Sequence, residues 1–240
     1  MVGVVDDAVV IEPRFRGPPE SANGGYACAM AAQWIDGPAE VTLRAPPPLG
    51  VPLRVERGDA GVALLADGAT IVEAVPGTVT LEVPAPVSLD DARRAASRYP
   101  WRDRHPYPTC FVCGPERTAP DGLEIFPGPV DGEALFAAPW TPDPSLADAD
   151  GSVRDEFVWA ALDCPSGIVT DLLGELGLIL LGRLSADLRE PVRAGVPHVV
   201  QAWPVEREGR KLHTGSALFT GDGALCAVAR ATWIELPQQR

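Results

Sequence analysis

The stretch VTLRAPPPLGVPLRVERGDAGVALLADGATIVEAVPGTVTLEV, residues 41–83, contains short runs of alternating apolar and polar residues separated by turn sequences. The turns are PPPLG, GD, DG and PG, in which proline and glycine favour a change of chain direction. Alternation with a period of two is typical of strands that bury one face, so the pattern predicts an antiparallel meander. Its strands are expected at residues 41–45, 52–57, 62–66, 69–75 and 79–83.

A helix that covers the apolar face of this meander is predicted just upstream. Residues 21–25 (SANGG) offer a helix start, and residues 26–35 (YACAMAAQWI) are rich in alanine, a strong helix former. A sheet needs a second layer over its apolar face. Small side chains on the helix would let the sheet curl tightly around it.

The second half of the chain repeats this order. Residues 133–138 (EALFAA) are expected to form a leading strand and residues 155–164 (DEFVWAALDC) a helix. Four strands are then expected, at residues 184–188, 199–206, 212–220 and 225–236. The succession of strand, helix and four strands therefore occurs twice, which indicates two copies of one unit.

Residues 85–130 separate the two copies and are too long for a simple turn. Ser88 followed by two aspartates predicts the start of a short helix, because a serine cap and early acids favour a helix N-terminus. We therefore expect an N-terminal unit over residues 1–84, a linker over 85–130 and a C-terminal unit over 131–240.

Composition excludes several classes of partner. The chain has 240 residues, 46% of them hydrophobic, and a formal net charge of −13, whereas nucleic acids bind clustered Lys and Arg. The N-terminal sequence carries acids where a signal peptide has basic residues, and residues 172–181, the longest apolar stretch, are interrupted and shorter than the roughly 20 residues of a membrane helix. We expect a cytoplasmic protein with reduced cysteines and no nucleic-acid or membrane partner.

Motifs in both halves resemble one family. The second half contains ALDCPSG, GRLSADLREPVRAG and EGRKLHTGSALFTGDGALCAVARATWIEL, and the first contains RFRGPPESANGGY. These segments resemble the hot-dog acyl-CoA thioesterase superfamily, in particular its phenylacetate-pathway thioesterase-like branch. The resemblance implies an α+β double hot-dog, in which two antiparallel sheets, each wrapped round a central helix, join into one continuous sheet. The same fold also hosts hydratases, dehydratases and non-catalytic proteins.

The resemblance also implies a composite site. In that family a polar residue and two glycines open the central helix, and an acid follows about two and a half turns later. Asn23, Gly24 and Gly25 match the opening in the first half, where the acid is missing. Asp163 matches the acid in the second half, where the glycines are missing. Each half keeps what the other lacks, so one complete site is expected between the units.

The expected chemistry starts from the unpaired N–H groups of a helix start. Gly24 and Gly25 would let a thioester carbonyl approach these groups and stabilise its developing oxyanion, and Asn23 would add an amide donor. Asp163 is expected to act as a general base on water or directly as a nucleophile. It lies in an apolar stretch, where an unpaired carboxylate would be costly.

Aromatic and basic residues are the candidates for substrate contact. Tyr26 and Trp159 lie on the two predicted helices, where each could belong to the core or line an acyl pocket. Arg193, Arg210 and Lys211 belong to the best local basic group of an acidic chain. A solvated turn and a clamp for the phosphates of coenzyme A both remain open for them. No cofactor is expected, since coenzyme A would enter as part of the substrate.

Residues 110–114 (CFVCG) are the most conspicuous short motif. A tetrahedral zinc site needs four ligands, whereas the sequence has no second CxxC and its three histidines are scattered. We therefore predict no metal and interpret the motif as a structural lead-in to the second unit, because similar segments followed by Gly-Leu occur in hot-dog relatives. Cys164, beside Asp163, is interpreted as buried packing and not as a nucleophile.

The sequence thus predicts hydrolysis of an acyl-CoA or acyl-carrier-protein thioester with an apolar or aromatic acyl group. Two alternatives remain. Hydration or dehydration of an enoyl thioester uses the same oxyanion stabilisation but normally needs a histidine or a second acid. A non-catalytic protein would only bind acyl-CoA or another apolar small molecule. We also expect a homodimer or higher homo-oligomer, and two helices that lie antiparallel beneath a shared sheet.

Overall fold

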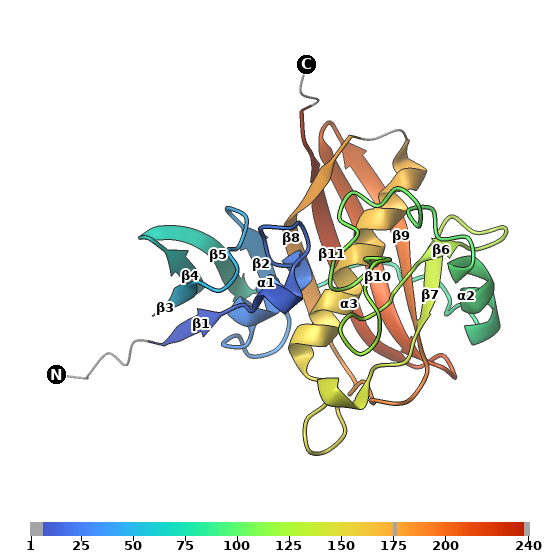
Figure 1. The fold of residues 1–240 in the computed structure, drawn as a ribbon, viewed down its shortest axis with the longest axis horizontal. Helices are drawn as coiled ribbons and strands as arrows, with labels where there is room; N and C mark the ends of the chain where they lie inside the picture. The colour runs from blue at the N-terminus through green and yellow to red at the C-terminus, as the bar shows by residue number, and fades with distance from the viewer. Residues whose placement is uncertain (1–6, 175–176, 238–240) are drawn as a thin grey trace.

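The computed structural model describes residues 7–174 and 177–237, and its main feature is one continuous sheet of eleven strands (Figure 1). The strand order is β1-β3-β4-β5-β2-β8-β11-β10-β9-β7-β6, and every neighbouring pair is antiparallel. Helices α1 (Gly24–Ala32) and α3 (Asp155–Ile168) lie side by side against this sheet, and α2 (Leu89–Ala96) lies near its β6 end.

The first half of the chain wraps its strands around α1. These strands are β1 (Ala8–Val10), β2 (Ala39–Leu43), β3 (Pro52–Gly58), β4 (Gly61–Ala66) and β5 (Ala69–Pro76). Four of the five strands predicted in the opening stretch are confirmed.

The fifth predicted strand, residues 79–83, is wrong, because the chain between β5 and α2 forms no regular element. Its alternating side chains, Val79, Leu81 and Val83, instead pack against a second apolar cluster that includes Val199 and Trp203 of the C-terminal half. Burial on another part of the protein produces the same alternation as pairing into a sheet. The pattern therefore identified a buried extended segment, but it did not show which part of the protein buries that segment.

The second half supplies the larger part of the sheet, around α3. Its strands are β6 (Gly128–Pro129), β7 (Phe136–Trp140), β8 (Ile179–Leu188), β9 (His198–Glu208), β10 (Lys211–Thr220) and β11 (Leu225–Glu235). Short 3-10 helices, η1 (Pro13–Phe15), η2 (Pro144–Leu146) and η3 (Val169–Leu173), complete the regular structure. A helix followed by four strands is confirmed in both halves. One strand, β1, precedes the helix in the first half, whereas two, β6 and β7, precede it in the second, and β6 lies within the predicted linker.

The two halves join along β2 and β8. Val41 lies opposite Leu184 and Ala39 opposite Ala186 in an antiparallel register. All four of these side chains are buried, with at most 1% of their surface exposed, so the junction is part of the core. An ion pair between Glu40 and Arg183, 2.9 Å long, spans the same two strands.

The limits of the helices differ from those predicted. Asn23 caps α1, which therefore begins two residues earlier than expected and ends at Ala32. The second helix was expected to end at Cys164, yet α3 continues through Pro165 to Ile168. A proline removes one helical hydrogen bond, and the burial of every residue from 157 to 168 offsets this loss.

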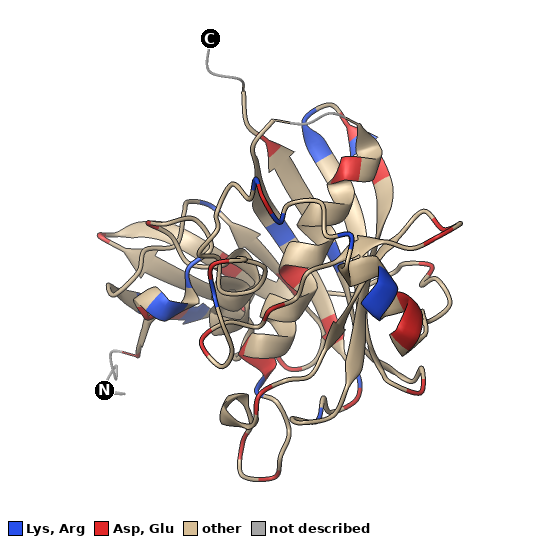
Figure 2. Ribbon diagram, turned by 45° about the vertical axis from the view of Figure 1, so that its right-hand side comes forward, with Lys and Arg blue, Asp and Glu red and all other residues tan. Residues whose placement is uncertain are grey.

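Charged residues occur on many elements of the fold. Figure 2 shows acidic and basic residues interspersed along helices, strand ends and loops. Within the described residues, no helix is both long and apolar enough to cross a lipid bilayer.

Candidate active site

The two central helices make very close contact at Gly25. A Cβ atom on Gly25 would lie 2.5 Å from the backbone oxygen of Trp159 and 2.6 Å from Cβ of Asp163. The start of α1 therefore lies beside the middle of α3. Because Ala32 at the other end of α1 shares a small pocket with Asp155 at the start of α3, the helices are antiparallel, as expected. This contact brings the two motifs of the predicted composite site together.

Asp163 is held by the start of α1. Its Oδ2 accepts hydrogen bonds from Nδ2 of Asn23 and from the backbone N–H of Gly25, each 2.8 Å long. The amide oxygen of Asn23 in turn accepts the backbone N–H of Tyr26 at 3.0 Å, which is a helix N-cap. Asn23 therefore fixes both the first turn of α1 and the orientation of the acid.

The other carboxylate oxygen of Asp163 is buried and has no hydrogen-bond partner among the described residues. Only 2% of the residue is exposed. Burial is the main influence on its pKa and raises it to about 7, while the hydrogen bonds from Gly25 and Asn23 act in the opposite direction. A carboxylate in this state is suited to accept a proton near neutral pH.

A cavity of about 1360 Å³ opens beside this acid. Asn23, Gly24 and Asp163 all line it. Most of its remaining wall is apolar, and two arginines contribute a basic part. The apolar residues include Leu43, Ile168, Leu181, Trp233 and Ile234, and the arginines are Arg44 and Arg104. A cavity of this size and lining is typical of a site for a small organic ligand.

Gly24 and Gly25 lie in different environments. Gly24 lines the cavity, and its N–H belongs to the first turn of α1, where no helical acceptor exists. The N–H of Gly25 is already taken by Asp163, and the space of its missing side chain is filled by α3. Gly24 is therefore the better candidate to contact a substrate carbonyl, while Gly25 supports the acid.

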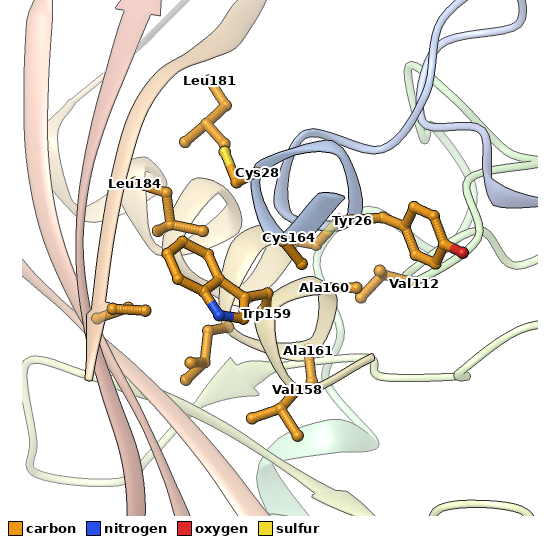
Figure 3. Packing of buried hydrophobic residues seen from close by; sticks show 14 of the residues in the cluster. Tyr26, Cys28, Val112, Val158, Trp159, Ala160, Ala161, Cys164, Leu181 and Leu184 are labelled. Atoms are coloured by element: carbon orange, nitrogen blue, oxygen red, sulfur yellow. The ribbon is translucent and has the colours of Figure 1, made fainter. Parts of the chain in front are cut away.

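The two aromatic candidates do not line the main cavity. The ring of Tyr26 stacks on Phe15, with ring centroids 4.2 Å apart, and lies on the side of Val112 (Figure 3). Trp159 is buried near Leu184 and contributes to the second, smaller pocket. Both side chains belong to the packing of the helix pair, which was the alternative interpretation.

The predicted basic residues also lie outside the described lining of the cavity. Arg193 donates hydrogen bonds to the Asp150 carbonyl and to Ser152, on a loop near the start of α3. Arg210 and Lys211 lie at the β9–β10 hairpin, where the Arg210 guanidinium donates to the Glu235 carbonyl at 3.4 Å. Their role in phosphate binding stays a prediction.

Sequence reasoning missed a group of thiols on the cavity wall. Cys110 and Cys113 of the CFVCG motif meet Cys164 of α3, and their three sulfur atoms lie within 4.8 Å of one another. Hydrogen bonds with Cys113 and Cys164 lower the pKa of Cys110 well below its usual value, whereas burial raises the pKa of Cys113. The CxxC spacing was the available signal, but the third cysteine lies 51 residues after Cys113 and is adjacent only in space.

Comparison with solved structures identifies the architecture. The tesB protein of Mycobacterium avium subsp. paratuberculosis superposes with a TM-score of 0.65 at 13% identity, over 99% of this chain and 95% of that one. A conserved protein of unknown function with hot-dog fold from Alicyclobacillus acidocaldarius gives 0.61 at 13% identity, over 97% and 93%. The fold is a double hot-dog.

A third solved structure, a presumed thioesterase II of Thermobifida fusca YX, matches over 98% of this chain and 94% of its own, with a TM-score of 0.60 and 16% identity. At these identities the likeness shows the fold alone. No protein-family model and no curated protein matches the chain. The predicted fold class, two sheet-wrapped helices under one continuous sheet, is confirmed.

Proposed function

We propose that this double hot-dog protein hydrolyses an acyl thioester, carried by coenzyme A or by a carrier protein, at one composite site between its two halves. The observation that carries the proposal is the state of Asp163. One oxygen is fixed by Asn23 and Gly25, the other has no partner among the described residues, and the residue lines a cavity large enough for an acyl chain. Solved structures with the same fold and the name thioesterase support the reaction class.

The reaction needs a group that accepts a proton from water and a group that donates a hydrogen bond to the thioester carbonyl oxygen. Asp163 would remove a proton from water, the water oxygen would bond to the thioester carbon, and the C–S bond would break as the sulfur takes up that proton. The N–H of Gly24 would stabilise the negative charge on the carbonyl oxygen. Direct attack by Asp163, giving an anhydride that water then opens, uses the same contacts.

The two routes differ in the fate of oxygen. A single turnover in heavy-oxygen water places the label in the acid product if water attacks first. Direct attack, followed by addition of water to the Asp163 carbon of the anhydride, places the label in the Asp163 carboxylate instead. Label in the peptide that contains Asp163, detected by mass spectrometry, therefore establishes direct attack.

The lining of the cavity sets the expected substrate. Apolar side chains such as Leu181 and Trp233 favour an aliphatic or aromatic acyl group. Arg104 on the same wall would contact phosphates, in addition to the predicted Arg193, Arg210 and Lys211, whereas Arg44 on that wall is already paired with Glu73 at 2.6 Å. Arg104→Gln should raise KM for an acyl-CoA and leave kcat little changed, because it removes binding and not chemistry.

The decisive experiment is release of free thiol from a panel of acyl-CoAs by the wild type and by Asp163→Asn. The asparagine oxygen can still accept the hydrogen bonds from Asn23 and Gly25, so the fold should persist while kcat falls by about 10²–10⁴-fold. Asp155→Asn is the matched control, since it makes the same change in the same helix outside the main cavity. Equal activity in wild type and Asp163→Asn would refute the proposal.

Enoyl-thioester hydration and plain ligand binding are less well supported. His105 lines the cavity, but its Nε2 lies 3.2 Å from Sγ of Cys113 and its Nδ1 accepts the N–H of Tyr107 at 2.8 Å. Both ring nitrogens are therefore engaged. Addition of water to an enoyl-CoA, measured as a loss of the ultraviolet absorbance of the enoyl thioester, would reveal a hydratase. Acyl-CoA binding by calorimetry without turnover would reveal a binder.

A further inference from the structure

Three buried thiols from two distant parts of the chain converge beside the cavity. The sulfur atoms of Cys110, Cys113 and Cys164 all lie within 4.8 Å of one another, and those of Cys110 and Cys164 are 3.6 Å apart. Zinc–sulfur bonds of about 2.3 Å at tetrahedral angles separate two sulfurs by roughly 3.8 Å. The Cys110–Cys164 separation is therefore close to that of two zinc ligands, and the Cys113 sulfur lies within 4.8 Å of both.

The turn that carries the first two cysteines is fixed by its backbone. The N–H of Cys110 donates to the Tyr107 carbonyl at 2.9 Å, and the N–H of Gly114 donates to the Cys110 carbonyl at 3.0 Å. A Cβ atom on Gly114 would lie 2.5 Å from the nitrogen of Cys110 and 2.5 Å from the Pro108 oxygen, so only glycine fits there. This fixed turn therefore holds both sulfurs close to Cys164 of α3.

The third sulfur comes from the interior of α3. Cys164 is buried with 8% of its surface exposed, and Nδ2 of Asn23 lies 3.5 Å from its Sγ. Buried cysteines often serve only as packing, but packing does not require three sulfurs from two distant segments to face one another. Such a cluster is the arrangement that soft, thiolate-bound metals select.

We propose that Cys110, Cys113 and Cys164 bind one Zn²⁺ ion through their thiolates and so join the linker to the central helix α3. When the ion binds, those of the three cysteines that are still protonated would lose their thiol protons to solvent. The sequence prediction of no metal rested on the missing second CxxC, and the fold supplies a further thiol from α3 instead.

His105 supports this site as a positioning residue. Because its Nδ1 accepts the N–H of Tyr107, the proton of the neutral ring lies on Nε2, which donates to Sγ of Cys113 3.2 Å away. A protonated nitrogen cannot ligate zinc, but an N–H donor stabilises a thiolate. The fourth ligand of the ion would then be a solvent molecule from the cavity, which all three cysteines line.

The site would stabilise the region around the proposed acid. Cys164 directly follows Asp163, and Cys110 belongs to a linker whose Phe111 N–H donates to the Arg16 carbonyl at 2.8 Å. A metal ion here would thus tie α3 to both the linker and the segment that precedes α1. This role is structural and does not depend on the reaction catalysed.

The test is the metal content and cobalt spectrum of the full-length protein, purified under reducing conditions and loaded with Zn²⁺ or Co²⁺. We expect one zinc per chain by mass spectrometry, and thiolate-to-cobalt charge-transfer bands together with the visible bands of tetrahedral cobalt. Cys113→Ser should lose the zinc. Cys226→Ser is the matched control, because Cys226 is also buried but lies at the start of β11, and it should keep the zinc.

His105→Gln should keep the zinc stoichiometry at saturation but weaken affinity by about 10–100-fold, the range for partners of metal ligands. The proposal is overturned if the wild type binds neither ion, or if Cys226→Ser loses as much zinc as Cys113→Ser. It is also overturned if the reduced protein binds cobalt but its spectrum lacks thiolate-to-cobalt charge-transfer bands. A wild type isolated only with a Cys110–Cys164 disulfide that reduction does not convert to a zinc-binding form also overturns it. The cobalt spectrum of the wild type tests the proposal even if a cysteine variant fails to fold.

Discussion

Replacement of Gly25 by alanine should destabilise the protein strongly, because the new methyl group has no space. Its carbon would lie 2.5 Å from the Trp159 oxygen, 2.6 Å from Cβ of Asp163 and 3.0 Å from Cα of Ala160. Two of these three atoms belong to the backbone of α3, so no rotation of a side chain relieves the contact. The helices must separate instead.

The expected cost combines two effects. Overpacking in a well-packed core costs typically about 1–3 kcal/mol. Separation of the helices also weakens the 2.8 Å bond from the Gly25 N–H to Asp163, and hydrogen bonds to charged groups are worth about 1.5–3 kcal/mol. We therefore expect Gly25→Ala to lower the free energy of unfolding by about 3 kcal/mol, and Tm by roughly 6–12 °C for a chain of this size.

The assay is thermal and urea unfolding followed by circular dichroism, with Gly24→Ala as the comparison. A Cβ on Gly24 would meet Cδ2 of Leu181 at 2.7 Å, which is the movable end of a side chain, so the cost should be about 1 kcal/mol. If Gly25→Ala were as stable as the wild type, or Gly24→Ala were the less stable of the two, the close contact of the helices would be refuted.

Three further outcomes are expected. Asn23→Ala should lower the free energy of unfolding by about 1–2 kcal/mol, because it removes the N-cap of α1, and an unchanged urea midpoint would contradict this. Ser88→Ala should cost about 1 kcal/mol through loss of the cap on α2, measured in the same way. Burial lowers the pKa of His198, so as pH falls this histidine is protonated in the unfolded chain before it is protonated in the folded protein. The stability that the neutral ring contributes is therefore present above the ordinary histidine pKa of about 6.5 and is lost as pH falls below it. His198→Gln should therefore flatten the decline of Tm between about pH 7 and pH 5, and an equally steep decline would count against the buried neutral ring.

The sequence was sufficient for much of the fold. Alternation and turn residues located β2–β5, β9–β11 and the second half of β8, because these strands are short apolar runs bounded by turn residues. The complementary motifs at Asn23 and Asp163 also anticipated a pair that the structure joins by a 2.8 Å hydrogen bond. The strands follow from local patterns in the chain, whereas the pairing of Asn23 with Asp163 was implied by the resemblance to the hot-dog family.

The remaining features depend on contacts between distant segments. The alternation of residues 79–83 does not say which surface buries them, and the structure places them on an apolar cluster of the second half. The meeting of Cys164 with the CFVCG motif, and the arrival of Arg104 at the cavity wall, are likewise set by the path of the linker. A local pattern records that a residue is buried or charged, but not what it faces.

The junction of β2 with β8 has a consequence for the order of folding during synthesis. The first half leaves the ribosome with the hydrogen-bonding edge of β2 (Ala39–Leu43) open, because its partner β8 (Ile179–Leu188) is made much later. An open edge strand can pair with another chain, whereas the finished sheet ends in the short strands β1 and β6, which offer little edge. We expect the nascent N-terminal half to be the aggregation-prone species of this protein, and a truncated chain that ends before β8 to be recovered mainly in association with chaperones.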